Sequence, residues 1–349
     1  MFSTLLRSTL AAIAISALTV SAAPGISLKV AGPESVNGVE NLKVVATITN
    51  TGDQTLKILN DPRGPLSTMP ADTFDITDSN GARPTFTGIK VKYSPEAAAA
   101  AGAFTVLAPG QSVHIEHNLS ETYNFTTSGS GSYNFEASNL FHIVDGASKI
   151  VPLYADSEAL TAKVSGNLAV ARKTQSAGLN KRATFVGCSA ARQTILNAAA
   201  SAAQSYAASA LSYLNSHTST STRYSTWFGT FTAARRSTVL SHFSLISGNN
   251  FASYTYDCTC TDSSYAYVYP SSFGVVYLCN AFWNAPVTGT DSRAGTLIHE
   301  SSHFTRNGGT NDYTYGQSSC KSLAISNPGN AVFNADSHEY FAENNPALS

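Results

Sequence analysis

The sequence has few charged residues and no excess of basic charge. Of its 349 residues, 12% are charged, and the formal net charge is −1. Without a basic field the chain does not attract nucleic acid or an anionic membrane surface, so we expect neither as a partner. The hydrophobic fraction of 43% is still large enough for folded cores, which excludes a wholly disordered chain.

Long hydrophobic runs are also missing. The apolar run at 10–20 is too short to span a bilayer. It follows Arg7 and precedes the small residues at 21–23, which is the pattern of a secretory signal peptide. We therefore predict a signal peptide over 1–22 and a secreted, extracellular protein; a buried N-terminal helix is the alternative interpretation.

Cysteine is absent from the first half of the chain. The five cysteines are Cys188, Cys258, Cys260, Cys279 and Cys320. In a secreted protein these should form disulfides, and the odd number leaves one thiol unpaired. The first half therefore has no cysteine thiolate that could coordinate a catalytic metal and inhibit it.

The first half shows the pattern of short β-strands. Hydrophobic and polar residues alternate at 42–49, and turn signals such as Asn80-Gly separate the runs. This spacing predicts a β-sandwich-like domain. No set of catalytic residues is evident in it, but Asn118 and Asn124 begin glycosylation sequons.

A polar linker at 166–180 ends in the dibasic pair Lys181-Arg182. Because this pair lies where the composition changes, we predict a processing site there. The predicted division is a signal peptide at 1–22, a propeptide at 23–182 and a catalytic domain at 183–349.

The second half is predicted to be mainly helical with a small β-sheet. Apolar residues recur at helical spacing in several segments. We expect helices over 189–217, 233–246, about 291–307 and 334–344, and strands over 265–269 and 274–279.

The predicted helix that ends near 307 carries His299-Glu300-Ser-Ser-His303. Residues four apart share one helix face, so both imidazoles can reach one metal ion. Glu300 would then lie beside the open coordination position as a general base.

A catalytic zinc site needs a third protein ligand. After His303 the chain reaches the pair Gly308-Gly309, which allows the backbone to reverse and return Asp312 to the metal, with Tyr315 close by.

The combined pattern resembles the aspzincin, or deuterolysin-type, metallopeptidases. In that family His-Glu-x-x-His is followed by Gly-Thr-x-Asp-x-x-Tyr-Gly, and 309–316 matches every fixed position. The resemblance covers 184–349. It implies one Zn²⁺ ion held by His299, His303 and Asp312, with Glu300 as the general base and Tyr315 stabilising the transition state.

A second segment concerns specificity. Asp336 and Glu339 are three residues apart and share a helix face, where they could hold an ammonium group or simply be solvated surface acids. The segment is similar to fungal peptidyl-Lys metalloendopeptidases, in which the matching acids line the pocket for the residue after the scissile bond. His338 between them is interpreted as structural support.

Lysine is nearly missing from the second half. Nine of the ten lysines lie at or before Lys181, and only Lys321 follows, whereas arginines occur on both sides. A lysine-directed protease would gain resistance to self-digestion from this distribution; ordinary composition bias is the alternative.

The resemblance also implies the disulfides Cys188–Cys258 and Cys260–Cys279, which leaves Cys320 as a buried free thiol. We expect a monomer that acts on peptides and binds its own propeptide. The rival hypotheses are an aspzincin of broad specificity, a secreted binding protein with a dead zinc site, and an N-terminal carbohydrate-binding module.

Overall fold

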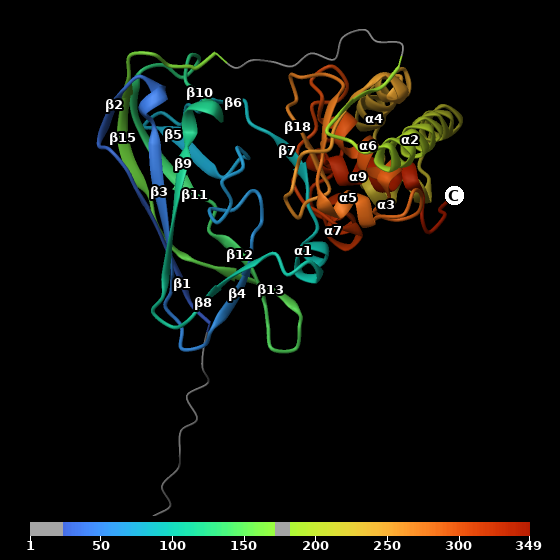
Figure 1. Cartoon of the computed structure of the whole chain (residues 1–349). Helices are drawn as coiled ribbons and strands as arrows, with labels where there is room; N and C mark the ends of the chain where they lie inside the picture. Colours follow the sequence, from blue (N-terminus) through green and yellow to red (C-terminus); the bar gives the residue numbers. More distant parts are fainter. Residues whose placement is uncertain (1–23, 172–181) are drawn as a thin grey trace, which may run out of the picture.

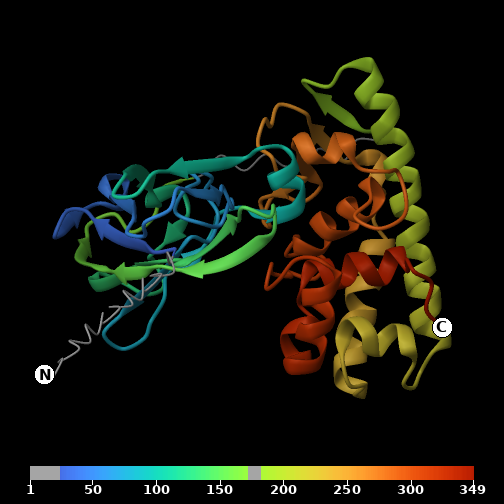
Figure 2. The same ribbon diagram turned by 90° about the horizontal axis from the view of Figure 1, so that it is seen from below.

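The computed structural model describes residues 24–171 and 182–349, so the predicted signal peptide and Lys181 lie outside the described residues. Within these ranges an all-β N-terminal half lies beside a mainly helical C-terminal half (Figures 1 and 2). The predicted contrast between the two halves is confirmed.

Three four-stranded sheets and one two-stranded pair form most of the N-terminal half. The sheet orders are β14-β1-β3-β9, β2-β15-β11-β5 and β13-β12-β4-β8, and β10 pairs with β6. The strands are β1 (Ile26–Ala31), β2 (Ser35–Asn37), β3 (Lys43–Asn50), β4 (Leu56–Leu59), β5 (Phe74–Asp78), β6 (Thr85–Phe86), β8 (Phe104–Leu107), β9 (Ser112–Asn118), β10 (Tyr123–Asn124), β11 (Gly131–Ala137), β12 (Leu140–Val144), β13 (Ile150–Tyr154), β14 (Asp156–Glu158) and β15 (Leu160–Ser165). The short helix α1 spans Pro95–Ala100.

The alternation seen in the sequence places one face of each strand in a common core. In β3, Val44 and Ile48 are fully buried, and they share a hydrophobic cluster with Phe135 of β11 and Val164 of β15. The first two sheets therefore pack face to face, as expected for a sandwich.

The C-terminal half has its own hydrophobic core, built mainly by helices. The helices are α2 (Ala190–Ser216), α3 (Thr222–Phe228), α4 (Ala233–Ser247), α5 (Asn280–Asn284), α6 (Arg293–His303), α7 (Gln317–Ser326), α8 (Pro328–Ala331) and α9 (Ala335–Glu343). The strands are β16 (Thr184–Val186), β17 (Thr255–Asp257), β18 (Ala266–Val268) and β19 (Val275–Leu278). None of the helices in the described part of the chain is long and apolar enough to cross a bilayer.

The long helix α2 shows why the alanine-rich segment folds as predicted. Its N-cap Ser189 accepts a hydrogen bond from the Arg192 amide. Seven residues form one buried stripe: Leu196, Ala199, Ala200, Ala203, Ala207, Ala210 and Leu214. The small side chains allow close packing against neighbouring helices.

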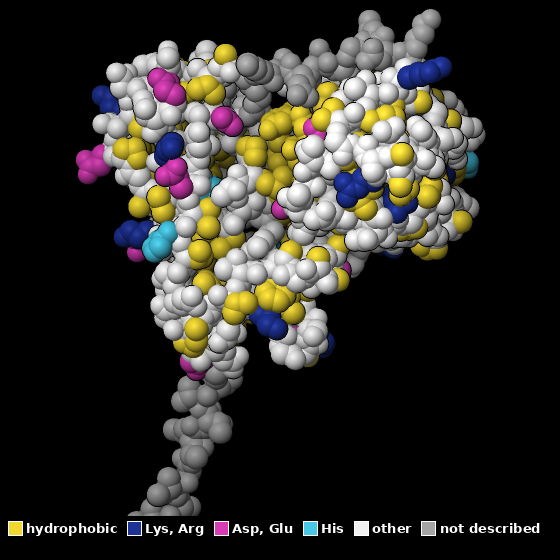
Figure 3. Space-filling model, in the orientation of Figure 1, with side chains coloured by type: hydrophobic (Ala, Val, Ile, Leu, Met, Phe, Trp, Pro, Cys, Tyr) yellow, Lys and Arg dark blue, Asp and Glu magenta, His cyan; other side chains and the backbone are white. Residues whose placement is uncertain are grey.

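Strand β7 (Lys90–Lys92) connects the two halves. It belongs to the N-terminal half by sequence, yet it forms the edge of the C-terminal sheet, whose order is β16-β17-β19-β18-β7. β7 lies beside β18 between the two bodies (Figure 1). Hydrophobic side chains gather on the surface where the halves meet (Figure 3).

Candidate active site

The His-Glu-x-x-His segment lies on α6, whose residues from Ala294 to His303 are all buried. The helix begins after Ser292, whose hydroxyl accepts a hydrogen bond from the Gly295 amide at 2.9 Å. Gly295 permits the close approach of α9, because a Cβ there would lie 2.1 Å from Glu343 Oε1. The neighbouring helix α9 is thereby brought beside the histidines.

The predicted helix end at 307 is wrong, because α6 ends at His303. Asn307 instead folds back, and its Nδ2 donates to the Ser301 carbonyl oxygen at 2.7 Å. Gly309 has φ +56°, which suits a residue without a Cβ, and the Thr310 amide then donates to the Ser302 carbonyl at 3.2 Å. The early turn is what returns the chain to the helix.

The returning loop brings Asp312 to both histidines. Asp312 Oδ1 lies 3.1 Å from His299 Nε2 and 3.2 Å from His303 Nε2. Among the residues that the structure describes, none of these three buried atoms has a hydrogen-bond partner. Ligands about 2.0–2.1 Å from a tetrahedral zinc lie about 3.3 Å apart, so the three atoms are spaced to hold one such ion.

Neighbouring groups orient both imidazoles. His303 Nδ1 lies 2.9 Å from the Thr310 carbonyl oxygen, so it is the protonated nitrogen and leaves Nε2 as a free acceptor. His299 Nδ1 lies 2.7 Å from Asp336 Oδ1. Burial pushes the pKa of Asp312 upward, but the two imidazoles outweigh it and hold that pKa well below its usual range.

Glu300 and Tyr315 lie on either side of a peptide bond of β7. Glu300 Oε1 accepts a hydrogen bond from the Lys92 amide at 3.2 Å, and the Tyr315 hydroxyl donates to the Val91 carbonyl oxygen. Burial raises the pKa of Glu300 to about 8, although His299 opposes the rise. A cation at the three ligand atoms would lower that pKa again.

Asp336 and Glu339 are not solvated surface acids: their side chains are 1% and 0% exposed. They surround the ammonium group of Lys92, whose Nζ lies 2.7 Å from Glu339 Oε2 and 3.7 Å from Asp336 Oδ1. Burial lowers the pKa of Lys92, but these carboxylates outweigh it and raise that pKa well above its ordinary value.

Three further groups in this pocket are not evident from the sequence. Asp291 Oδ1 lies 3.1 Å from Lys92 Nζ and also accepts a hydrogen bond from the Tyr340 hydroxyl at 2.8 Å. The Tyr265 and Tyr340 rings lie 5.1 and 5.7 Å from the ammonium. In the sequence, Asp291 marks only the approximate start of a predicted helix, and its positive φ of 51° is not recognisable there.

His338 points away from the pocket and into the core. Its Nδ1 lies 2.9 Å from the Asn334 carbonyl oxygen and its Nε2 lies 3.0 Å from His242 Nδ1. His338 therefore donates through Nδ1 and accepts through Nε2, and its ring lies against Phe228 and Phe243. These contacts agree with a structural role.

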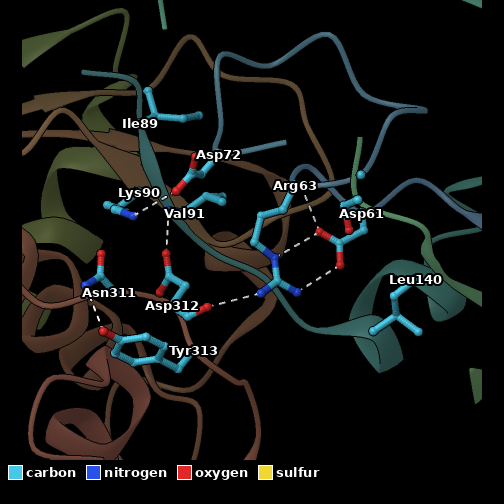
Figure 4. Close-up of a pocket in the computed structure, with 12 residues that line it drawn as sticks. Asp61, Arg63, Asp72, Ile89, Lys90, Val91, Leu140, Asn311, Asp312 and Tyr313 are labelled. Carbon is cyan, nitrogen blue, oxygen red and sulfur yellow. Dashed lines mark hydrogen bonds and ion pairs between the residues drawn. The ribbon is translucent and has the colours of Figure 1, made fainter. Parts of the chain in front are cut away.

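The N-terminal half also reaches the site, although nothing in the sequence of that half predicts it. Arg63 lies over the Tyr315 ring at 4.2 Å and donates to the Asp312 carbonyl oxygen at 3.3 Å. Figure 4 shows the hydrogen bond from Arg63 to Asp312, with Val91 beside Asp312 and with Asp61 bound to Arg63. A cavity of about 450 Å³, lined by residues of both halves, remains here.

The disulfides are Cys188–Cys258 and Cys260–Cys279, and Cys320 is a buried free thiol, as the resemblance implied. The first bond joins the start of α2 to the end of β17, and the second joins that region to the end of β19.

The remaining predicted sites lie on the surface or partly so. Of the sequon asparagines, Asn118 is exposed at the end of β9 and Asn124 is half-buried in β10. Arg182 of the dibasic pair is exposed just before β16.

Comparison with known proteins gives a consistent result. Residues 213–343 match the aspzincin family, described as lysine-specific metallo-endopeptidase. A peptidyl-Lys metalloendopeptidase of Grifola frondosa is 60% identical over 95% of this chain and 97% of its own. One of Armillaria mellea is 57% identical over all of both chains.

Two shorter proteins match only part of the chain. A peptidyl-Lys metalloendopeptidase of Pleurotus ostreatus is 75% identical over 168 residues, which is 48% of this chain and all of its own. A solved zinc peptidase from Grifola frondosa is 63% identical, with a TM-score of 0.46, and covers 46% of this chain and 100% of its own.

These matches, together with the site on α6, define a metalloendopeptidase that acts on proteins or peptides. The buried histidine pair and the aspartate returned by the 304–312 loop form a group that could hold the metal ion of such an enzyme. The chain belongs to the aspzincin family.

Proposed function

We propose that this protein is a secreted zinc endopeptidase that hydrolyses peptide bonds on the amino side of lysine and is made as a precursor. The zinc assignment rests on three buried ligand atoms, those of His299, His303 and Asp312, which have no hydrogen-bond partner within 24–171 and 182–349 and suit zinc in type and spacing. Zinc held there would polarise the scissile carbonyl and make a water molecule nucleophilic at neutral pH.

Glu300 would take a proton from the attacking water and deliver it to the leaving amine. Its Oε1 already accepts a hydrogen bond from the amide nitrogen of Lys92, the atom that corresponds to that amine. The water oxygen bonds to the carbonyl carbon, the C–N bond breaks, and the amine leaves protonated. The Tyr315 hydroxyl, aimed at the Val91 carbonyl oxygen, would stabilise the negative charge that develops there.

Lysine specificity is carried by one observation: an ammonium group lies in the pocket beside Glu300. Three carboxylates and two aromatic rings surround Lys92 Nζ, and the lysine side chain is 2% exposed. A buried site with this excess of negative charge favours a cationic side chain. The names of the Grifola and Armillaria relatives agree with this proposal.

The N-terminal half at 23–182 is proposed to be a propeptide removed after Lys181-Arg182. Two observations support this. The Pleurotus relative matches over its full length, yet the match covers only 48% of this chain. In addition, β7 of the N-terminal half pairs with β18 and so occupies the candidate active site of the C-terminal half. We propose a monomer that binds one zinc ion. N-terminal sequencing of secreted protein separates a propeptide from a retained carbohydrate-binding module.

Mass spectrometry of peptides released from a mixed protein digest tests the activity. Products should begin with lysine, and a zinc chelator should stop the digestion. Products with varied first residues would favour an aspzincin of broad specificity. Chelator-insensitive digestion, or none by the processed protein, would contradict the proposal; membership in a peptidase family already weighs against a binding protein with a dead zinc site.

A further inference from the structure

The cleft of the C-terminal half is filled by an extended segment of the same chain. β7 runs antiparallel to β18, with Val91 opposite Tyr267 and Lys92 opposite Ala266. The Tyr265 amide also donates to the Lys92 carbonyl oxygen at 2.9 Å. Adding a strand to an exposed sheet edge is a general way in which proteins bind extended peptides.

The register places one peptide bond at the reactive groups. The Val91 carbonyl oxygen accepts from the Tyr315 hydroxyl, and the Lys92 amide donates to Glu300. The Val91 amide donates to Asp312 Oδ2 at 3.2 Å, while the other oxygen of that carboxylate faces the histidines. The Val91–Lys92 bond therefore lies where a scissile bond would lie, in the same direction.

The side chain of Lys92 makes β7 resemble a lysine-containing substrate in particular. Lysine is seldom fully buried unless it is paired. Here its ammonium lies 2.7 Å from Glu339 and 3.1 Å from Asp291, at the end of the pocket proposed to recognise lysine. Arg63 adds a second attachment, because it covers the Tyr315 ring from outside.

We propose that β7 is an internal pseudosubstrate, in which Lys92 occupies the lysine pocket and holds the N-terminal half over the active site. The inference rests on the proposed lysine specificity and states how the precursor is kept inactive. A tethered segment competes at an effective concentration on the order of millimolar, so a micromolar substrate is excluded.

The same strand supplies a matched control. Lys90 is two residues away, but its ammonium lies over the Phe86 ring at 4.6 Å and 4.0 Å from Asp72 Oδ2, both in the N-terminal half. Replacing Lys90 removes the same charge from β7 without emptying the pocket.

The experiment compares three full-length precursors: wild type, Lys92→Ala and Lys90→Ala. Each is purified unprocessed, its intact mass is checked, and the initial rate on a fluorogenic lysine peptide is measured over a range of concentrations. Each is then cleaved after Lys181-Arg182 by a dibasic-specific protease. Because both substituted positions leave with the N-terminal half, all three yield the same mature chain, whose activity reports whether the catalytic domain had folded.

We expect Lys92→Ala to lower the apparent KM of the precursor at least about tenfold, toward that of the mature chain, with Lys90→Ala like wild type. Equal KM values for the two variants, or a wild-type precursor as active as the mature chain, would overturn the inference. Mature chains without activity on lysine peptides would instead refute the proposed function.

Discussion

Glu339→Gln is the sharpest test of the lysine pocket. With Lys92 standing in for the substrate side chain, Glu339 Oε2 is 2.7 Å from the ammonium and is fully buried. The gross attraction at this distance is about 6 kcal/mol at an effective dielectric constant of 20. Removing one partner of such a buried pair costs roughly 2–5 kcal/mol. Because Asp336 and Asp291 retain part of the field, we expect about 2–3 kcal/mol, or a loss of about 30- to 150-fold in kcat/KM.

The assay compares two peptides that differ only at the residue after the scissile bond, lysine or its uncharged isostere norleucine. Glu339→Gln should lower kcat/KM for the lysine peptide alone. Asp291→Asn should cost only about fivefold or less, because that side chain is 38% exposed and its pairing is screened by water. Equal losses on both peptides would refute the reasoning, since they would indicate general damage to the site. Asp336 is a poorer choice because it also lies 2.7 Å from His299.

Three further results are expected. Glu300→Gln should abolish turnover and leave one equivalent of zinc bound, as measured by metal analysis; loss of the metal with the activity would contradict a role in proton transfer alone. Tyr315→Phe should lower kcat about 10²- to 10³-fold with little change in KM, and a change in KM alone would contradict transition-state stabilisation. Burial lowers the pKa of His242 to about 4 and that of His338 to about 3, so their neutral forms stabilise the fold fully above pH about 6.5 and this stabilisation is lost as the pH falls toward 4. Calorimetry of the full chain should show Tm falling over that range, and a His338→Gln chain with an equally steep fall would contradict the assignment.

In the C-terminal half, the elements that local patterns predicted end within one or two residues of their expected bounds, except at the end of α6. The helix over 189–217 was found almost to the residue, because alanine spacing and the Ser189 cap both act within a few residues. The end of α6 was missed by four residues, because it is set by a tertiary requirement: the chain must turn at Phe304 so that Thr310 can meet His303. Nothing in the propensities of 304–307 records that contact.

In the candidate active site, too, local sequence patterns predicted some residues, whereas residues placed by tertiary contacts could not be predicted. Spacing on one helix, and a resemblance over eight residues of the following loop, placed both histidines and Asp312 together. Lys92 could not be chosen, because nine lysines lie in the first half and only the pairing of β7 with β18 selects one of them. Asp291 was hidden for a related reason, since a backbone turn directs it toward a residue 199 positions away.

The pairing of β7 with β18 suggests a physical reason for the near absence of lysine after Lys181. If substrates bind as β7 does, as an extended strand paired with β18, a lysine is at risk only where the chain can extend. Lys321, the one lysine after the dibasic pair, lies in the middle of α7, with its ammonium near the Trp227 ring and beside Gln317. Its preceding residue, Cys320, is fully buried, so the Cys320–Lys321 bond reaches the cleft of another molecule only if α7 unfolds. Lysines in the strands of the N-terminal half have no such protection, which agrees with the proposal that this half is a propeptide absent from the mature enzyme.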